Sequence, residues 1–152
     1  MVQIARAAES DVAQLVELLQ SLFAIEQDFA ADPGRQQRGL MCLLRQPHDR
    51  AALFVARSGG EVTGMASGQL VISTAEGAPS VWIEDVIVAE RFRGQGIGRA
   101  LLRSVIDWSA AQGATRAQLL ADRDNAAAIA FYQRAGLDPT NLVALRLSRL
   151  AD

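Results

Sequence analysis

Lysine is missing from the sequence, and cysteine, histidine and tyrosine occur once each, as Cys42, His48 and Tyr132. Without lysine there is no Schiff-base chemistry and no phosphate-binding loop of the GxxxxGK[ST] type. One cysteine excludes a disulfide framework, a CxxC redox pair and a thiolate zinc site, and one histidine excludes a histidine-rich metal site. Any chemistry must therefore use carboxylates, hydroxyls, the one tyrosine, amides, arginine or backbone groups.

Long apolar runs and an excess of basic charge are also missing. No stretch of about 18 apolar residues occurs, and charged side chains interrupt the first thirty residues, so neither a membrane span nor a signal peptide is predicted. The formal net charge of −2 argues against a general nucleic-acid binder. We expect a cytoplasmic protein that acts on neither nucleic acid nor membrane.

What the chain does have is the composition of one soluble domain. Of its 152 residues, 50% are hydrophobic and 21% are charged. A chain of this length buries roughly 70% of the surface that it exposes when unfolded, so it can form a core without cross-links. We expect a single domain over residues 1–152.

The hydrophobic period changes between helical and strand spacing along the chain. A helix follows the opening strand, three β-branched segments form an antiparallel meander, and helices and strands alternate afterwards. The predicted strands are 2–6, 51–56, 61–72, 81–88, 115–121 and 142–150. One predicted helix begins after residue 10, and the other predicted helices cover 35–45, 97–113 and 125–135. This order predicts an α/β fold with a mixed sheet and helices on both faces.

The strongest local signal is the glycine-rich stretch Arg91–Arg99, RFRGQGIGR, between a predicted strand and a predicted helix. Three glycines in five residues let the backbone turn sharply and bring successive N–H groups near a ligand. At a helix N-terminus, these groups and the helix dipole form an anion site. Four nearby arginines would suit a pyrophosphate: Arg91, Arg93, Arg99 and Arg103.

Two alternatives remain for this turn. A dinucleotide-binding unit would carry GxGxxG after its first strand, whereas here the spacing is GxGxG and the turn follows four predicted strands. Only 54 residues follow Gly98, too few for the rest of a doubly wound sheet. The other alternative is a glycine-rich connection that binds nothing.

Residues 88–100 resemble the acyl-CoA-binding motif of the GNAT superfamily of N-acetyltransferases. That motif reads Gln/Arg-x-x-Gly-x-Gly/Ala, and Arg93, Gly96 and Gly98 stand at its positions. The resemblance extends to the expected order of elements along most of the chain.

A second family element lies on the helix after the next strand, where an asparagine is followed seven residues later by a tyrosine. Asn125 and Tyr132 match it. The helix ends at Gly136, and Leu137 then stands where the family more often has phenylalanine. The two motifs occur in the family's order and at its separation.

The resemblance implies the GNAT fold, a mostly antiparallel sheet in which the strand ending at Val88 and the strand 115–121 are parallel neighbours that splay apart. The pantetheine arm of acetyl-CoA would lie in the gap and pair with the backbone, a small-molecule form of strand addition. Its diphosphate would lie on the glycine-rich turn, and no metal is implied. The implied cofactor-binding residues are Val86, Ile87, Val88, Arg93, Gly94, Gln95, Gly96, Ile97, Gly98, Arg99 and Asn125.

Transfer of an acetyl group from a thioester to an amine requires a proton for the departing thiolate. A phenol with an ordinary pKa near 10 stays protonated at neutral pH, so we expect Tyr132 to be the acid. The alternative is a tyrosine at the rim of the core whose hydroxyl contacts a backbone group.

Two adjacent carboxylates, Glu84 and Asp85, interrupt the apolar run 81–88. Buried carboxylates there are costly without a function or a partner, and they point to opposite faces unless a bulge intervenes. The pair resembles that of polyamine and glucosamine-phosphate acetyltransferases. We expect Glu84 to be the base, with a raised pKa or a water relay, and Asp85 to orient the substrate or the strand. The reverse assignment stays open, as does a pair that only orders a bulge or binds an arginine.

Other reactive residues have weaker cases. Cys42 is expected to be a small buried hydrophobe, and His48 to lie in a surface turn. Asp28, Phe29 and Asp32 either line the acceptor pocket or form a solvated acidic loop.

These observations predict an enzyme that transfers the acetyl group of acetyl-CoA to a primary amine by direct attack in a ternary complex. The acceptor would be a small molecule of the polyamine, amino-sugar, aminoglycoside or amino-acid type. A homodimer is expected from the resemblance alone. The alternatives are a non-catalytic acyl-CoA sensor of the same fold and an acetyltransferase acting on protein N-termini or lysines.

Overall fold

The computed structural model describes residues 1–23 and 32–150. The chain divides into two compact units, Met1–Leu119 and Leu120–Asp152. Each unit is considered by itself below.

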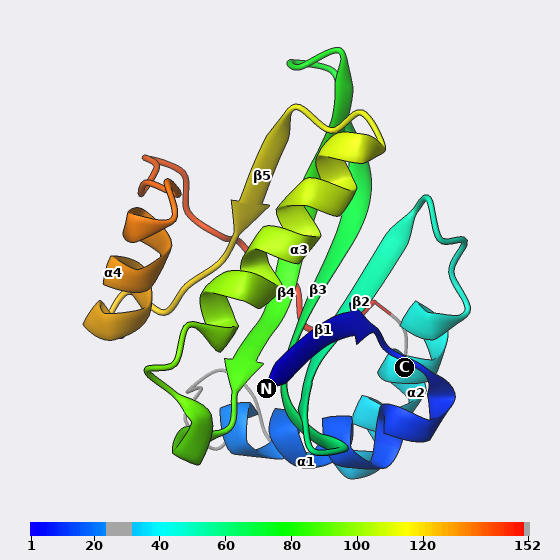
Figure 1. Cartoon of the computed structure of the whole chain (residues 1–152). Helices are drawn as coiled ribbons and strands as arrows, with labels where there is room; N and C mark the ends of the chain where they lie inside the picture. Colours follow the sequence, from blue (N-terminus) through cyan, green and yellow to red (C-terminus); the bar gives the residue numbers. More distant parts are fainter. Residues whose placement is uncertain (24–31, 151–152) are drawn as a thin grey trace. The chain divides into compact units, whose positions relative to one another are not determined.

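A five-stranded sheet forms the first unit, in the order β1-β2-β3-β4-β5 (Figure 1). The first four strands pair antiparallel, and β4 pairs with β5 in parallel. This topology confirms the predicted meander and mixed sheet. The strands are β1 (Val2–Arg6), β2 (Ala51–Ser58), β3 (Glu61–Ser73), β4 (Ala78–Val88) and β5 (Arg116–Leu119).

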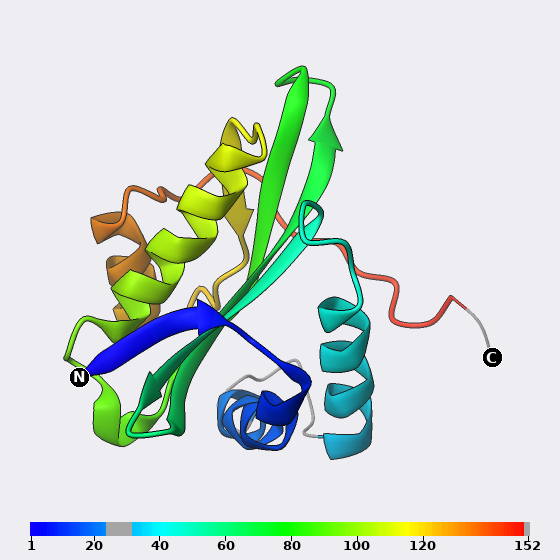
Figure 2. The same ribbon diagram turned by 45° about the vertical axis from the view of Figure 1, so that its right-hand side comes forward.

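Helices lie on both faces of this sheet. The helices of the first unit are α1 (Val12–Phe23), α2 (Pro33–Leu44) and α3 (Ile97–Ala111). Figure 2 shows α1 and α2 together on one side of the sheet and α3 on the other. Two short 3-10 turns complete the unit, η1 (Glu9–Asp11) and η2 (Glu90–Phe92).

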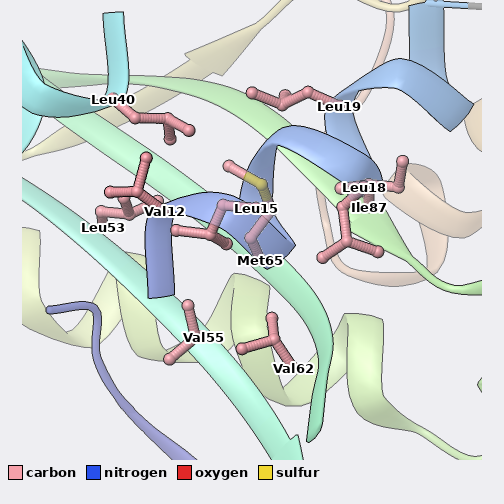
Figure 3. Packing of buried hydrophobic residues seen from close by; sticks show 10 residues of the cluster. All are labelled: Val12, Leu15, Leu18, Leu19, Leu40, Leu53, Val55, Val62, Met65 and Ile87. Atoms are coloured by element: carbon pink, nitrogen blue, oxygen red, sulfur yellow. The ribbon is translucent and has the colours of Figure 1, made fainter. Parts of the chain in front are cut away.

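A core of buried apolar side chains joins α1 and α2 to the sheet (Figure 3). Helix α1 contributes at three- and four-residue spacing, which places its apolar side chains on one face. Full burial of each such side chain stabilises the fold by about 1.5–3 kcal/mol. The cluster consists of Val12, Leu15, Leu18, Leu19, Leu40, Leu53, Val55, Val62, Met65 and Ile87.

On the other face, glycines in β3 let α3 lie close to the sheet. A Cβ atom on Gly68 would lie 2.6 Å from Cγ1 of Val105, and one on Gly64 would lie 2.9 Å from Cδ1 of Leu101. Side chains alternate along a strand, so residues 64 and 68 face α3 while Met65 faces α1. The apolar face predicted for α3 is confirmed, because its members Ile97, Leu101, Val105 and Trp108 are buried.

The second unit contains α4 (Ala126–Arg134), which Asn125 precedes and Gly136 follows in a left-handed conformation with φ 93°. The prediction of a strand at 142–150 is wrong, because this segment forms no strand. Alternating apolar residues become a strand only where a neighbouring strand supplies hydrogen-bond partners, and within the described ranges no strand pairs with this segment. Its large apolar side chains are exposed: Leu142, Val143, Leu145, Leu147 and Leu150.

Candidate functional site

Strand β4 continues past the point where its pairing with β5 ends. The parallel register joins Ser80–Ile83 to Arg116–Leu119, and β4 then runs on to Val88. Residues 84–88 therefore have no strand on this side within the described sheet. The parallel register of β4 and β5 confirms the parallel pair that the resemblance implied. The open backbone edge can accept an extended ligand by strand-like hydrogen bonds.

A β-bulge lies at the start of this open segment. Asp85 and Val86 together stand opposite Ala66, because the register shifts by one residue there. Asp85 takes a left-handed backbone conformation with φ 56°, which the first residue of one bulge type requires and which glycine usually supplies. Aspartate tolerates this conformation better than most residues. The bulge also brings Glu84 and Ile87 to the same face of β4, which simple alternation would not.

The two carboxylates of this segment have different surroundings. Glu84 is exposed, and its Oε1 atom accepts a hydrogen bond of 2.8 Å from the indole nitrogen of Trp82. Asp85 is half-buried. Burial, and then the negative charge of Glu84, raise the pKa of Asp85 from its ordinary value of 3.8 to about 6. Asp85 is therefore ionised at neutral pH and is a stronger proton acceptor than an ordinary carboxylate.

The glycine-rich turn joins η2 to α3. Gly94 and Gly96 have φ angles of 76° and 81°, and Gly96 is the residue that caps α3. A Cβ atom on either glycine would meet nothing within 4 Å. Backbone conformation, rather than crowding, therefore calls for glycine here. The first N–H groups of α3 have no partner within the helix, so they can bind an anion.

Two of the four arginines near this turn are engaged in ion pairs. Arg91 pairs with Glu61, and Arg103 pairs with Asp107 at 2.9 Å between Nε and Oδ1. Both pairs are exposed and contribute little to stability. They nevertheless reduce the positive charge that these two arginines offer to a ligand.

The other two arginines form no ion pair with a described carboxylate, so their full charge is available to a ligand. Arg93 donates a hydrogen bond of 2.9 Å from Nε to the carbonyl oxygen of Val88, which holds its guanidinium beside the end of β4. Arg99 is exposed and forms no ion pair with any residue that the structure describes. Of the four arginines that the sequence places near the turn, Arg93 and Arg99 are thus the two that pair with no described carboxylate.

Asn125 and Tyr132 both belong to the second unit. The Oδ1 atom of Asn125 accepts a hydrogen bond of 3.1 Å from the N–H group of Ala128 and so caps α4. Sequence reasoning missed this role, although asparagine before a helix is a common signal for it. Tyr132 is half-buried two turns later, with its ring edge-on to that of Phe131 at 5.2 Å between centroids.

Cys42 and His48, for which the sequence offers little reason to expect a catalytic role, lie on α2 and in the turn before β2. Cys42 is exposed, so the expectation of a buried cysteine is wrong. The reason is helix geometry: Leu40 faces the core, and a residue two positions later lies about 200° around the helix. His48 lies in the turn before β2, where its carbonyl oxygen accepts hydrogen bonds of 2.8 Å from Arg6 and 3.0 Å from Trp108.

Of the three residues considered for an acceptor pocket, Asp28 and Phe29 lie outside the described residues. Asp32 caps α2 by accepting a hydrogen bond of 3.1 Å from the N–H group of Arg35. In the described ranges, no three or more His, Cys, Asp or Glu side chains are grouped so that they could hold a metal ion. No helix of this part of the chain is long and apolar enough to cross a membrane.

The model of the acetyltransferase (GNAT) family matches residues 13–137. The chain belongs to this family. The match spans both units and includes the glycine-rich turn, the bulge of β4 and helix α4.

Curated relatives share about a third of their residues with this GNAT protein over the aligned part. N-acetyltransferase family 8 member 2 of Rattus norvegicus is 33% identical over 89 residues, which are 59% of this chain and 39% of the relative. Streptothricin acetyltransferase of Streptomyces lavendulae is 33% identical over 88 residues, which are 58% of this chain and 44% of the relative. The aligned part thus spans less than half the length of either relative.

Solved structures match nearly the whole chain. A putative acetyltransferase from Agrobacterium tumefaciens has a TM-score of 0.79 at 26% identity, covering 97% of this chain and 99% of that one. Glucosamine-6-phosphate N-acetyltransferase from Arabidopsis thaliana has a TM-score of 0.79 at 19% identity, covering 98% and 99%. The likeness to the plant enzyme shows the fold alone, and together these matches confirm the GNAT fold.

Proposed function

We propose that this protein is an acetyl-CoA-dependent N-acetyltransferase that acts on a primary amine of a small molecule. The observation that carries the proposal is the arrangement along one stretch of chain: a bulge with a basic carboxylate, an open strand edge and a glycine-rich helix N-terminus follow one another over residues 84–99. The name of one curated relative, streptothricin acetyltransferase, supports a small amine as acceptor.

Acetyl-CoA would bind along this stretch from its acyl end to its diphosphate. The pantetheine amides pair with the open backbone edge at Val86, Ile87 and Val88, which no strand occupies on that side of the described sheet. The diphosphate binds the N–H groups from Gly94 to Gly98, including those at the start of α3, and the arginines Arg93 and Arg99 neutralise it.

Proton transfer assigns the two carboxylates different tasks. As the amine nitrogen attacks the thioester carbon, Asp85 accepts the proton that the nitrogen loses, directly or through a water molecule. Its raised pKa supports this role over Glu84, which the sequence favoured. Glu84, whose Oε1 atom is already held by Trp82, orients the amine.

The same transfer requires an acid for the leaving group. When the carbon–sulfur bond breaks, the sulfur carries the electron pair, and we assign Tyr132 to protonate it because of its place in the family motif. Asn125 can use its side-chain nitrogen toward the cofactor, since its oxygen caps α4. The products are the acetylated amine and free coenzyme A.

Release of free thiol from acetyl-CoA with a panel of polyamines, amino sugars, aminoglycosides and amino acids tests this function. We expect turnover with one of these classes and a loss of about 10²-fold or more in kcat for Tyr132→Phe, since general acid catalysis contributes about 10²–10⁴-fold. Binding of acetyl-CoA, measured by calorimetry, should change little in this variant. Binding without thiol release from any amine would instead favour a sensor.

The homodimer and the cytoplasmic location stay predictions. Sedimentation tests the first, and cell fractionation tests the second.

A further inference from the structure

The bulge in β4 is held by a buried hydroxyl group from the neighbouring strand. Ser67 of β3 is 1% exposed, and its Oγ atom donates a hydrogen bond of 3.0 Å to the carbonyl oxygen of Glu84. Ser67 is also the register partner of Glu84, directly before the register shifts. The hydrogen bond thus lies at the boundary between the regular ladder and the bulge.

This hydrogen bond fixes the peptide group that precedes Asp85. The extra residue of a bulge disrupts the regular ladder, so backbone groups there need other partners. The carbonyl of Glu84 belongs to the same planar peptide as the N–H group of Asp85. Because φ of Asp85 is measured from this peptide plane, holding the plane helps to keep φ at 56°. The hydroxyl of Ser67 therefore contacts the peptide group from which the Asp85 side chain takes its direction.

We propose that Ser67 is a positioning residue for acetyl transfer, which holds the Glu84–Asp85 peptide so that the Asp85 carboxylate meets the attacking amine. This inference rests on the proposed function for its kinetic consequence. Its structural part, that the hydroxyl maintains the surroundings of Asp85, can be measured without turnover.

Ser80 provides a matched control. It is 2% exposed on β4, and its hydroxyl donates a hydrogen bond of 3.2 Å to the carbonyl oxygen of Arg116 on β5. Ser80→Ala therefore removes the same kind of buried bond between neighbouring strands, but outside the bulge. Urea unfolding of Ser67→Ala and Ser80→Ala should show two folded proteins of similar stability.

Steady-state kinetics with a productive amine then separate the two variants. We expect Ser67→Ala to lower kcat by about 10- to 100-fold, because displacement of a catalytic group by about 1 Å costs up to about 10²-fold. KM for acetyl-CoA should stay within about twofold, since the open edge and the glycine turn remain. Ser67→Thr, which keeps the hydroxyl, should restore most of kcat, and Ser80→Ala should leave kcat within about threefold.

A double-mutant cycle shows whether Ser67 acts through Asp85. In an Asp85→Asn background, Ser67→Ala should cause almost no further loss of kcat, because the group that it positions is already inactive. A full additional loss in that background, or equal kcat values for Ser67→Ala and Ser80→Ala, would overturn the proposal.

Carbon-13 NMR of the Asp85 carboxyl group tests the structural part without substrate. The pKa of Asp85 should be about 6 in the unmodified protein and in Ser80→Ala, and should fall toward 3.8 in Ser67→Ala as water enters the loosened bulge. Glu84, the neighbouring residue on β4 itself, is the group whose charge raises this pKa, so its carboxyl group is followed in the same spectra. If no amine were acetylated but the Ser67→Ala titration shifted alone, the proposed function would fail while the role of Ser67 at the bulge would stand. An unshifted titration would overturn that role.

Discussion

Asp85 combines a left-handed backbone conformation with a half-buried carboxyl group. A left-handed conformation costs an ordinary residue about 1–2 kcal/mol, and burial opposes the charged form of the side chain. Strained residues of this kind persist where surrounding structure holds them, and they gather at functional sites. At the scale of one residue, Asp85 is thus the part of the candidate site with the clearest stability cost.

Asp85→Asn should therefore stabilise the protein at neutral pH. Because the folded pKa of about 6 lies above the ordinary 3.8, the folded state binds the proton more tightly, and the stability contributed by this group falls as pH rises from about 4 to 6. The full penalty above pH 6 is up to about 3 kcal/mol, at 1.36 kcal/mol per pKa unit. Asparagine tolerates the left-handed conformation and carries no charge.

Urea unfolding of both proteins between pH 3.5 and 8 measures this difference. We expect the advantage of Asp85→Asn to be near zero at the acidic end and to grow up to pH 6, while acetyl transfer is lost at every pH. Glu84→Gln is the control for removal of a neighbouring charge. An advantage of Asp85→Asn that did not change with pH would contradict the raised pKa.

Strand β3 controls how closely α3 approaches the sheet. Gly68→Ala would place a Cβ atom 2.6 Å from Val105 and 2.9 Å from Val81, so these side chains must move. Overpacking of a core typically costs about 1–3 kcal/mol, which is the loss of stability that we expect in urea unfolding. The control is Gly39→Ala on the exposed side of α2, where nothing lies within 4 Å and alanine should stabilise the helix by up to about 1 kcal/mol.

The turn before α3 is the second element with a testable role. Gly96→Ala forces alanine into a left-handed conformation with φ 81° and adds a methyl group where the diphosphate is proposed to bind. We expect the Kd for acetyl-CoA in calorimetry to rise at least about tenfold. Gly77→Ala, at φ 64° in the turn between β3 and β4, imposes similar strain away from the cofactor and should leave that Kd unchanged. Equal Kd values for the two variants would remove the turn from the cofactor site.

At the scale of the whole molecule, cofactor binding must appear as stability. A ligand that binds only the folded state at 100 times its Kd stabilises it by about 2.7 kcal/mol. For a domain of this size, each kcal/mol raises Tm by about 2–4 °C, so saturating acetyl-CoA should raise Tm by about 5–10 °C. Thermal unfolding with and without acetyl-CoA measures this shift, and acetate at the same concentration is the control. No shift, together with no heat of binding, would reject the cofactor site.

The sequence predicted most of the fold because helices and strands leave short-range periods. The helical face of α3 and the β-branched meander were both found in this way, and the glycine-rich turn was found from backbone requirements. Residues 142–150 show the limit of the method. Their alternation is that of a strand, but strand formation depends on a partner that periodicity does not reveal.

The sequence by itself determined the family, the order of elements up to α4, and the residue types available for acid, base and anion binding. Only the tertiary structure decided where pairing between β4 and β5 stops, that a bulge turns Asp85 into a left-handed conformation, and that Arg91 pairs with Glu61. The physical reason is range. Propensity and periodicity act between near neighbours in the chain, whereas strand register, burial and ion pairs depend on residues that folding brings together from distant positions.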